Sequence, residues 1–331
     1  MFEKDHHQYR PSKSMPLEQL RRLFGKRVQE KISLARYTSA RIGGPADALV
    51  IANSLEELSE AAEHLWSSDL PFIVLGGGSN VLVSDAGVRE VVILNRAKDI
   101  RFAEQEGQPV VWAESGASLG LIARQASSRG YPGLEWAAGI PGTLGGAVVG
   151  NAGAHGSDMS ENLILAEILH RSRMTGTARL EGGVPSRETW MPEKLSFAYR
   201  SSTLKSLPGE AVVLAALLRL GRSTPGSHAE IQAKMAAFNE QRRRTQPPGA
   251  SMGSMFKNPP GDYAGRLIEK ADLKGTRIGD AEISSLHANF FINHKEARAK
   301  DVQSLMELAR SRVAEKFSVH LEAEIEFIGE W

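Results

Sequence analysis

The sequence contains no cysteine among its 331 residues. Disulfide bonds and cysteine-ligated metal centres are therefore excluded. Long apolar runs are also missing, since none approaches the roughly 18 residues that a membrane-spanning helix needs. The opening segment, MFEKDHHQYRPSKS, has no apolar stretch of the kind found in secretory signals. We therefore expect a cytoplasmic protein with no membrane-inserted segment.

Neither sign of charge is in excess, because 40 Lys and Arg residues against 39 Asp and Glu residues give a formal net charge of +1. A nucleic-acid-binding surface usually needs a basic excess, and only the short cluster Arg242–Arg244 departs from this balance. The nine histidines show no convincing ligand spacing with carboxylates, so we predict no metal. With 41% hydrophobic residues, a chain of this length can bury a substantial core and form two or three domains.

Glycine, by contrast, is plentiful, and its first dense group lies between two apolar runs. PFIVLGGGSNVLVSD, from Pro71 to Asp85, is typical of a strand, a tight loop and a second strand. Gly76, Gly77 and Gly78 allow a positive φ and carry no Cβ, so backbone N–H groups can converge on an anion such as a pyrophosphate. The alternative is an ordinary hairpin turn. Neither a P-loop lysine nor a GxGxxG at a helix start is present, which argues against P-loop and Rossmann sites.

A second glycine-rich segment, GLEWAAGIPGTLGGAVVGNAGAHG, runs from Gly133 to Gly156. So many glycines are entropically costly, and the segment is too apolar for a disordered linker. A backbone that must approach a large flat ligand closely would explain both features. A glycine-rich region of packed turns is the alternative.

The remaining pattern predicts an α+β protein with several domains. Residues 1–36 are weakly patterned, and we interpret them as an N-terminal tail and adaptor. Ser54 and Glu57 are spaced as a capping box, which predicts a helix after a strand in a first lobe at 37–98. A second lobe at 99–222 is expected to alternate strands with one helix, and the two lobes would clasp a ligand between them.

A third domain is expected at 223–331. The best linker candidate is GRSTPGS, at 221–227. Ser227 and Glu230 have the spacing of another capping box, so we expect a helix to open this domain. Near its end, Glu322, Glu324 and Glu326 alternate with apolar residues, as on one face of a strand.

Several motifs follow one another in a specific order. They are LGGGSN, AGIPGTLGGAV with NAGAHG, FAYRSS (197–202), GSMFKNP (253–259), AGRLIEKADLKG (264–275) and EAEIEFIG (322–329). In these motifs and their order the chain resembles the UDP-N-acetylenolpyruvoylglucosamine reductase (MurB) family. The preceding YTSARIGGPAD (37–47) is similar to the start of that family's flavin domain. The resemblance therefore covers nearly everything from Tyr37 onward.

This resemblance implies a two-lobed FAD-binding (PCMH/VAO-like) region followed by a C-terminal α+β substrate-binding domain. NADPH would reduce FAD and depart, and UDP-N-acetylglucosamine enolpyruvate would then take hydride from flavin N5 to give UDP-N-acetylmuramate. FAD would be held without a covalent bond, because the chain has no cysteine and His155 lies in no familiar linkage motif. The residues expected to hold it are Arg41, Gly76, Gly77, Gly78, Ser79, Asn80, Gly139, Ile140, Pro141, Gly142, Thr143, Gly146 and Gly153.

Hydride addition to an enol-ether acrylate pushes charge into the carboxylate and the α-carbon. The site therefore needs a cation, a second polar group and a proton donor. The resemblance gives these roles to Arg200, to Glu324 as the group that polarises the carboxylate, and to Ser254 as the acid. Taken without the family, Arg200 could form a surface ion pair and Glu324 could face solvent on an ordinary strand. Ser254 could cap a short helix that begins near Asp262, or satisfy a turn.

The resemblance also suggests residues for the UDP-sugar. They are His155, Tyr199, Arg242, Lys257, Asn258, His287 and Asn289. The chain departs from the family in having His155 for Tyr, Leu286 for Lys and Trp136 for Leu or Phe. Only eighteen residues separate Arg200 from Arg219, which resembles the short form that lacks a tyrosine-bearing insert. We expect a monomer. An FAD-dependent oxidase of the same superfamily and a non-catalytic nucleotide-binding protein are the alternatives.

Overall fold

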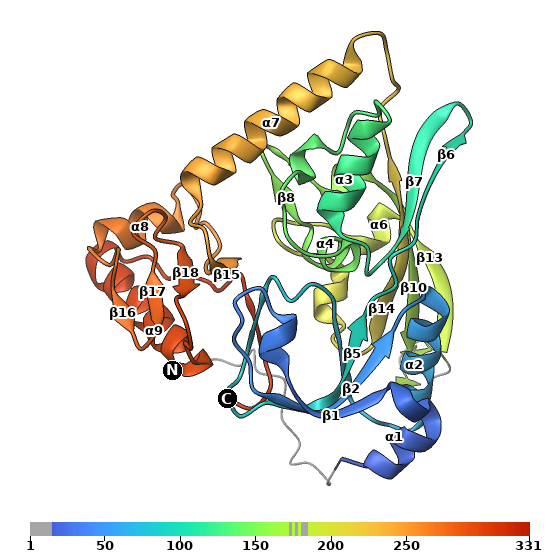
Figure 1. Cartoon of the computed structure of the whole chain (residues 1–331), viewed down its shortest axis with the longest axis horizontal. Coiled ribbons are helices and arrows are strands. Elements are labelled where there is room, and N and C mark those ends of the chain that lie inside the picture. The colour runs from blue at the N-terminus through green and yellow to red at the C-terminus, as the bar shows by residue number, and fades with distance from the viewer. Residues whose placement is uncertain (1–14, 172–173, 176–177, 180–184) are drawn as a thin grey trace.

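The structure is a computed structural model that describes residues 15–171, 174–175, 178–179 and 185–331. Residues 1–14, part of the predicted tail, lie outside the described residues. Figure 1 shows two lobes packed together and a C-terminal domain set apart from them, with one long helix, α7 (Ser227–Thr245), reaching across. No helix within the described ranges is long and apolar enough to cross a membrane.

The first lobe is built on a four-stranded sheet with the order β1, β2, β5, β3. Its strands are β1 (Val28–Ser33), β2 (Pro45–Ala52), β5 (Val88–Asn95) and β3 (Phe72–Leu75). β2, β5 and β3 run parallel, whereas β1 pairs antiparallel with β2 at the edge. Parallel strands are usually covered on both faces, which explains why β2 and β5 are nearly continuous apolar runs. Helix α2 (Leu55–Ser67) packs Leu58, Ala61 and Leu65 into the same core.

The amino-terminal segment also belongs to this lobe. Helix α1 (Leu17–Phe24) buries Leu20 and Phe24 in the core that α2 shares, and β1 completes the sheet. The first lobe therefore begins at α1, rather than at residue 37 after a separate adaptor.

The second lobe contains a five-stranded antiparallel sheet with the order β13, β10, β14, β7, β6. Its strands are β6 (Ile100–Gln105), β7 (Gln108–Glu114), β10 (Leu163–Arg171), β13 (Pro185–Trp190) and β14 (Ala211–Arg219). Helix α3 (Leu119–Ser128) begins after its cap, Ser118, and ends just before Gly130, which has a φ of +76°. Helices α3 and α4 (Leu144–Gly150) bury most of their apolar side chains in the core of this lobe.

The C-terminal domain has its own four-stranded sheet, in the order β15, β18, β17, β16. These strands are β15 (Ala250–Ser254), β16 (Arg277–Ile278), β17 (Ala281–Ile283) and β18 (Phe290–Asn293). Helices α8 (Ala264–Lys270) and α9 (Ala299–Phe317) pack on it and share a hydrophobic core that also includes Ala40, Ile42 and Leu82 of the first lobe. The mixture of helices and strands in all three parts agrees with the α+β class expected from the sequence.

Helix α7 leads from the second lobe to this domain. Ile231 and Met235 lie in the core of the second lobe, while the core of the C-terminal domain includes Met252 and the residues after it. The structure therefore places α7 with the second lobe, although the sequence analysis placed the domain boundary before this helix.

Only one of the two predicted capping boxes forms, and it forms in part. Ser54 Oγ accepts a hydrogen bond from Glu57 N at 3.2 Å, but the Glu57 carboxylate reaches Asn53 N, at 2.8 Å, instead of Ser54 N. Ser227 does not cap α7, because Gly226 takes the cap position with a φ of 88°. Glycine can adopt that left-handed conformation without a steric cost. It has no side chain, so α7 begins without a side-chain cap.

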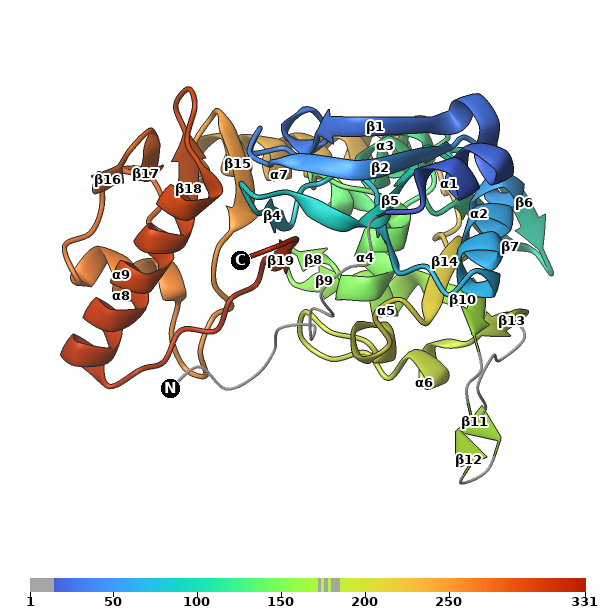
Figure 2. The same ribbon diagram turned by 90° about the horizontal axis from the view of Figure 1, so that it is seen from below.

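The end of the chain returns to the first lobe. After α9, strand β19 (Glu326–Ile328) pairs in parallel with β4 (Val81–Val83), which directly follows the GGGSN loop (Figure 2). The short elements that remain are η1 (Gly25–Arg27), η2 (Leu34–Tyr37), η3 (Glu135–Ala137), β8 (Gly153–Ala154), β9 (Ser157–Asp158), α5 (Met159–Asn162), β11 (Met174–Thr175), β12 (Ala178–Arg179), α6 (Pro192–Leu195) and η4 (Thr203–Ser206).

Candidate active site

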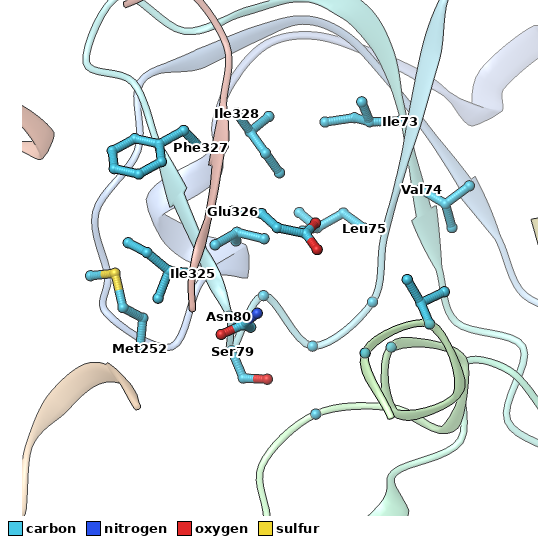
Figure 3. A pocket seen from close by; sticks show the side chains of 18 of the residues that line it. Ile73, Val74, Leu75, Ser79, Asn80, Met252, Ile325, Glu326, Phe327 and Ile328 are labelled. Carbon is cyan, nitrogen blue, oxygen red and sulfur yellow. The ribbon is translucent and has the colours of Figure 1, made fainter. Parts of the chain in front are cut away.

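A cleft of about 3400 Å³ is lined by residues from both lobes and from the C-terminal domain. A pocket for one small ligand usually measures ~300–1000 Å³, so this cleft has room for more than one. Part of its wall is apolar and is formed by Ile73, Val74, Leu75 and Ile328 (Figure 3). The loop that carries Ser79 and Asn80 lies beside this wall.

The first glycine loop is no hairpin. β3 pairs with β5, and β4 pairs with β19, so the two strands that flank the loop diverge into different pairings. Only Gly78 uses a positive φ, of +58°, so the expectation of positive φ is wrong for Gly76 and Gly77. Both glycines are needed because the second glycine-rich segment packs closely against this loop. A Cβ on Gly76 would lie 2.4 Å from Thr143 Oγ1, and one on Gly77 would lie 3.0 Å from Gly142 Cα.

The second glycine-rich segment faces the first across this contact. Gly142 has a φ of +112°, and a Cβ on it would lie 2.7 Å from Ser79 Oγ. The residues of this segment that line the cleft and that the sequence analysis assigned to the cofactor are Ile140, Pro141, Gly142, Thr143, Gly146 and Gly153. The two loops thus bring main chain without bulky side chains to the same part of the cleft. A pyrophosphate can be bound by such exposed main-chain N–H groups.

Two residues expected to hold FAD do not line this cleft. A Cβ on Gly139 would meet Asn239 Oδ1 at 2.8 Å, so this glycine gives room to α7. Arg41 is exposed and has a φ of +56°. Its main-chain carbonyl accepts a hydrogen bond from Asn293 Nδ2 at 3.4 Å. Arg41 thus lies at a contact with the C-terminal domain.

Arg200 and Glu324, 124 residues apart, form an ion pair in the wall of the cleft. Arg200 Nε donates to Glu324 Oε1 at 2.9 Å, and another guanidinium nitrogen donates to the carbonyl of Gly153 at 2.9 Å. Arg200 has a φ of +55°, an unusual conformation for a residue with a side chain. The exposed fractions of the two side chains are 25% and 18%. This burial argues against a surface ion pair.

The environment of Glu324 makes its charged form less favourable than that of a carboxylate in water. Burial raises the pKa of the Glu324 carboxyl above its ordinary value, and the nearby charge of Arg200 opposes that shift only in part. Its neighbours in the alternating segment differ, because the side chains of Glu322 and Glu326 are 71% and 53% exposed. Glu324 is therefore not one of three equivalent solvent-facing carboxylates.

Ser254 is the last residue of β15 and also lines the cleft. Its hydroxyl makes no hydrogen bond to another part of the chain that the structure describes. Met255 and Phe256, which follow it, are fully buried and anchor the segment. Met255 O accepts a hydrogen bond from Glu324 N at 2.9 Å, so the segments of Ser254 and Glu324 are directly joined.

Among the residues expected to bind the UDP-sugar, three line the cleft: His155, Arg242 and Lys257. Burial lowers the pKa of the Arg242 guanidinium, whose side chain packs against Gly139. Lys257 forms an ion pair with Glu322. The cleft therefore has cations on both its α7 side and its C-terminal-domain side.

The imidazole of His155 lies flat against Phe238 of α7, with ring centroids 3.9 Å apart. Burial lowers the pKa of His155, and the charge of Arg242 lowers it further. His155 is consequently neutral at neutral pH, so it offers hydrogen bonds and a ring face rather than a charge.

The other four expected residues lie elsewhere. Asn289 is buried and exchanges hydrogen bonds of 3.0 and 2.8 Å with the main chain of Phe256, so it supports the segment next to Ser254. Asn258 Oδ1 accepts from Ala264 N at 3.1 Å at the start of α8. His287 packs against Phe290 within the C-terminal domain. Tyr199 is 53% exposed, with its ring 5.0 Å from the Arg200 guanidinium.

Lys205 is a cleft residue that sequence reasoning missed. Its Nζ lies 3.6 Å from Glu326 Oε1, and its charge also opposes the raised pKa of Glu324. It follows Arg200, in the short helix η4, and belongs to no recognisable motif, so only the fold reveals its place. No group of three or more His, Asp or Glu side chains in the described ranges could hold a metal ion, and the absence of a metal stays a prediction.

Two family models match the chain. Residues 46–185 match an FAD binding domain, and residues 244–328 match the C-terminal domain of UDP-N-acetylenolpyruvoylglucosamine reductase. The chain is 43% identical to the UDP-N-acetylenolpyruvoylglucosamine reductase of Rubrobacter xylanophilus, over 90% of this chain and 94% of that one. It is 42% identical to the enzyme of the same name from Chloroflexus aggregans, over 89% and 95%.

A solved structure is similar as well. It is the UDP-N-acetylenolpyruvylglucosamine reductase (MurB) of Thermus caldophilus, which is 37% identical with a TM-score of 0.73. The match covers 91% of this chain and 99% of that one. The likeness therefore extends over both lobes and the C-terminal domain.

Proposed function

The chain belongs to the UDP-N-acetylenolpyruvoylglucosamine reductase (MurB) family, and from this premise we propose that it reduces UDP-N-acetylglucosamine enolpyruvate to UDP-N-acetylmuramate, with NADPH as reductant and FAD as cofactor. The reaction supplies a precursor of peptidoglycan. The observation that carries the proposal is the Arg200–Glu324 pair, which lines the same cleft as the two glycine loops.

The glycine loops support the assignment of the cofactor. Bound FAD supplies the chemistry of accepting hydride from NADPH and passing it to the substrate. The loops at 76–80 and 140–143 would hold its pyrophosphate with main-chain N–H groups. No cysteine is present to attach it, so we expect FAD to be bound noncovalently.

Arg200 and Glu324 would act on the enolpyruvyl carboxylate. As the substrate gains charge, the guanidinium of Arg200 stabilises the carboxylate, which matches its forked geometry. Glu324 has a raised pKa, which suits a carboxyl that keeps its proton and donates a hydrogen bond to the substrate. Arg200 could then be shared between Glu324 and the substrate.

Ser254 would donate a proton to the α-carbon. Its hydroxyl lines the cleft next to the segment of Glu324 and is not engaged by another described residue. A hydroxyl is a weak acid, so this role requires that water be excluded when the substrate is bound.

His155, Arg242 and Lys257 are the residues whose positions best support contact with the sugar nucleotide. Arg242 and Lys257 would neutralise the diphosphate, and neutral His155 would donate or accept a hydrogen bond. NADPH and sugar nucleotides are cytoplasmic metabolites, so we expect the enzyme to act in the cytoplasm.

An absorbance spectrum of the purified protein tests the function. We expect a flavin spectrum that bleaches with NADPH under anaerobic conditions and returns rapidly when UDP-N-acetylglucosamine enolpyruvate is added. A colourless protein would favour the nucleotide-binding alternative. Reduced protein that reacts rapidly with air, but not with the enolpyruvyl substrate, would favour the oxidase.

A further inference from the structure

The first glycine loop contacts the terminal segment through Asn80. Asn80 Nδ2 donates to the main-chain carbonyl of Glu324 at 3.1 Å, and Asn80 O accepts from Glu326 N at 2.9 Å. Asn80 thus holds the main chain on both sides of Ile325, whose side chain is buried. Figure 3 shows Asn80 next to the segment that carries Ile325 and Glu326.

The opposite side of Glu324 is held by the segment that carries Ser254. Glu324 N donates to Met255 O at 2.9 Å, and the neighbouring Ala323 forms an isolated bridge with Phe256. The main chain at Glu324 therefore connects two parts of the cleft: the glycine loop and the end of β15. Its carboxylate is left to contact Arg200.

A second link joins the same two parts. Ser39 N donates to Gly78 O at 2.9 Å, and Ser39 Oγ donates to Ser251 O in β15 at 2.6 Å. The glycine loop is thus tied to the strand of Ser254 by Ser39, and to Glu324 by Asn80. A shift of the loop would be transmitted to both proposed catalytic groups.

We propose that Asn80 is a positioning residue whose side chain sets the place of Glu324 relative to a cofactor held by the glycine loop. This inference rests on the proposed function. The amide of Asn80 is engaged with Glu324, so we assign it to this role rather than to cofactor binding. Removing it leaves the carbonyl of Glu324 without that donor and loosens the segment there, while the main-chain bonds to Asn80 O and Met255 O remain. A misplacement of about 1 Å can cost roughly a hundredfold in rate.

A double-mutant cycle in the flavin-loaded enzyme tests the proposal. Asn80→Ala, Glu324→Ala and the double variant are compared in anaerobic stopped-flow, with reduction by NADPH and reoxidation by the enolpyruvyl substrate followed separately. We expect Asn80→Ala to keep its FAD and its rate of reduction, while reoxidation slows about ten- to a hundredfold. Because Asn80 acts through Glu324, the double variant should be no slower than Glu324→Ala alone.

Asn80→Asp keeps the shape of the side chain but loses the hydrogen-bond donor, so it should slow reoxidation as Asn80→Ala does. This variant replaces Asn80→Ala in the cycle if Asn80→Ala does not fold. The matched control is Ser84→Ala, which removes a side-chain hydrogen bond to the same terminal segment at Glu330 O, away from Glu324. Its reoxidation rate should stay at the wild-type value.

Three results would overturn the inference. In the first, both Asn80 variants lose FAD, which would make Asn80 a cofactor-holding residue. In the second, reduction and reoxidation slow equally. In the third, the losses of the two single variants add in the double variant. Failure of the wild-type enzyme to be reoxidised by the substrate is a separate outcome, which refutes the proposed function and this inference with it.

Discussion

The imidazole of His155 and the ring of Phe238 stack with their planes 9° apart and their centroids 3.9 Å apart. His155 lies in the second glycine-rich segment, and Phe238 lies on α7. The stack therefore joins the wall of the cleft to the helix that carries Arg242, and burial there keeps His155 neutral.

Burial of His155, together with the charge of Arg242, shifts the pH range in which this residue responds. Its pKa is lowered below the ordinary 6.5, so protonation, which would add charge for the diphosphate, occurs only in more acidic solution. We expect the KM for the UDP-sugar to rise with pH below about 6.5 and to be flat above it. His155→Tyr, which keeps an aromatic ring, should abolish the acidic dependence. The same KM profile in both enzymes would remove His155 from the diphosphate site.

Substitutions at Gly77 test the contact between the two glycine loops. A Cβ there would lie 3.0 Å from Gly142 Cα, so Gly77→Ala should lower FAD occupancy and Gly77→Val should lower it more. The ratio of flavin to protein absorbance after purification measures this occupancy. Full occupancy in Gly77→Val would refute the assignment of this loop.

Heat or acid treatment of the wild-type protein should release all FAD into the supernatant.

Ser254→Ala separates the two half-reactions. If Ser254 acts only after hydride transfer, FAD binding and reduction by NADPH should stay nearly intact, while reoxidation by the substrate slows about a hundredfold to ten-thousandfold. Arg200→Ala should impair the same half-reaction through lost stabilisation of charge. The measurement is anaerobic stopped-flow at the flavin absorbance. Equal slowing of both half-reactions by Ser254→Ala would make this serine a structural residue.

The raised pKa of Glu324 predicts a pH dependence of reoxidation. Burial favours the neutral carboxyl, so the protonated form persists above the ordinary value of 4.5 and is lost as pH rises through the raised pKa. The reoxidation rate should fall over that range. Glu324→Gln donates a hydrogen bond without titrating, so it should lack this fall and should react faster than Glu324→Ala. A fall that persists in Glu324→Gln must arise from another group.

Asp85 should contribute to the docking of the C-terminal domain. Its carboxylate accepts hydrogen bonds from Ala299 N at 2.8 Å and Lys300 N at 3.0 Å, so a residue of the first lobe caps α9. Loss of such a cap costs about 1 kcal/mol, so Asp85→Ala should lower the free energy of unfolding by that amount. Urea denaturation measures it. Glu240→Ala, which removes surface pairs within α7, is the control and should change little.

Local sequence determined many of the elements. The one helix expected in the second lobe is α3, which begins after its cap at Ser118, and the apolar run at β2 forms a strand, because these signals act within a few residues. One local prediction failed, because Gly226 takes the cap position that the spacing gave to Ser227. Other predictions failed where separate segments meet, since the first lobe recruits β1 from the predicted adaptor.

The sequence by itself determined the family, and with it the residue types expected at the site. Motif order sufficed for that, since GGGSN, FAYRSS, GSMFKNP and EAEIEFIG together are specific. Only the tertiary structure decided which of these residues meet. Glu324 looks like one of three alternating carboxylates, but Asn80 and Met255 hold its main chain, and its carboxylate lies largely buried beside Arg200. Burial and charge act through space between residues 124 positions apart, and no local pattern encodes them.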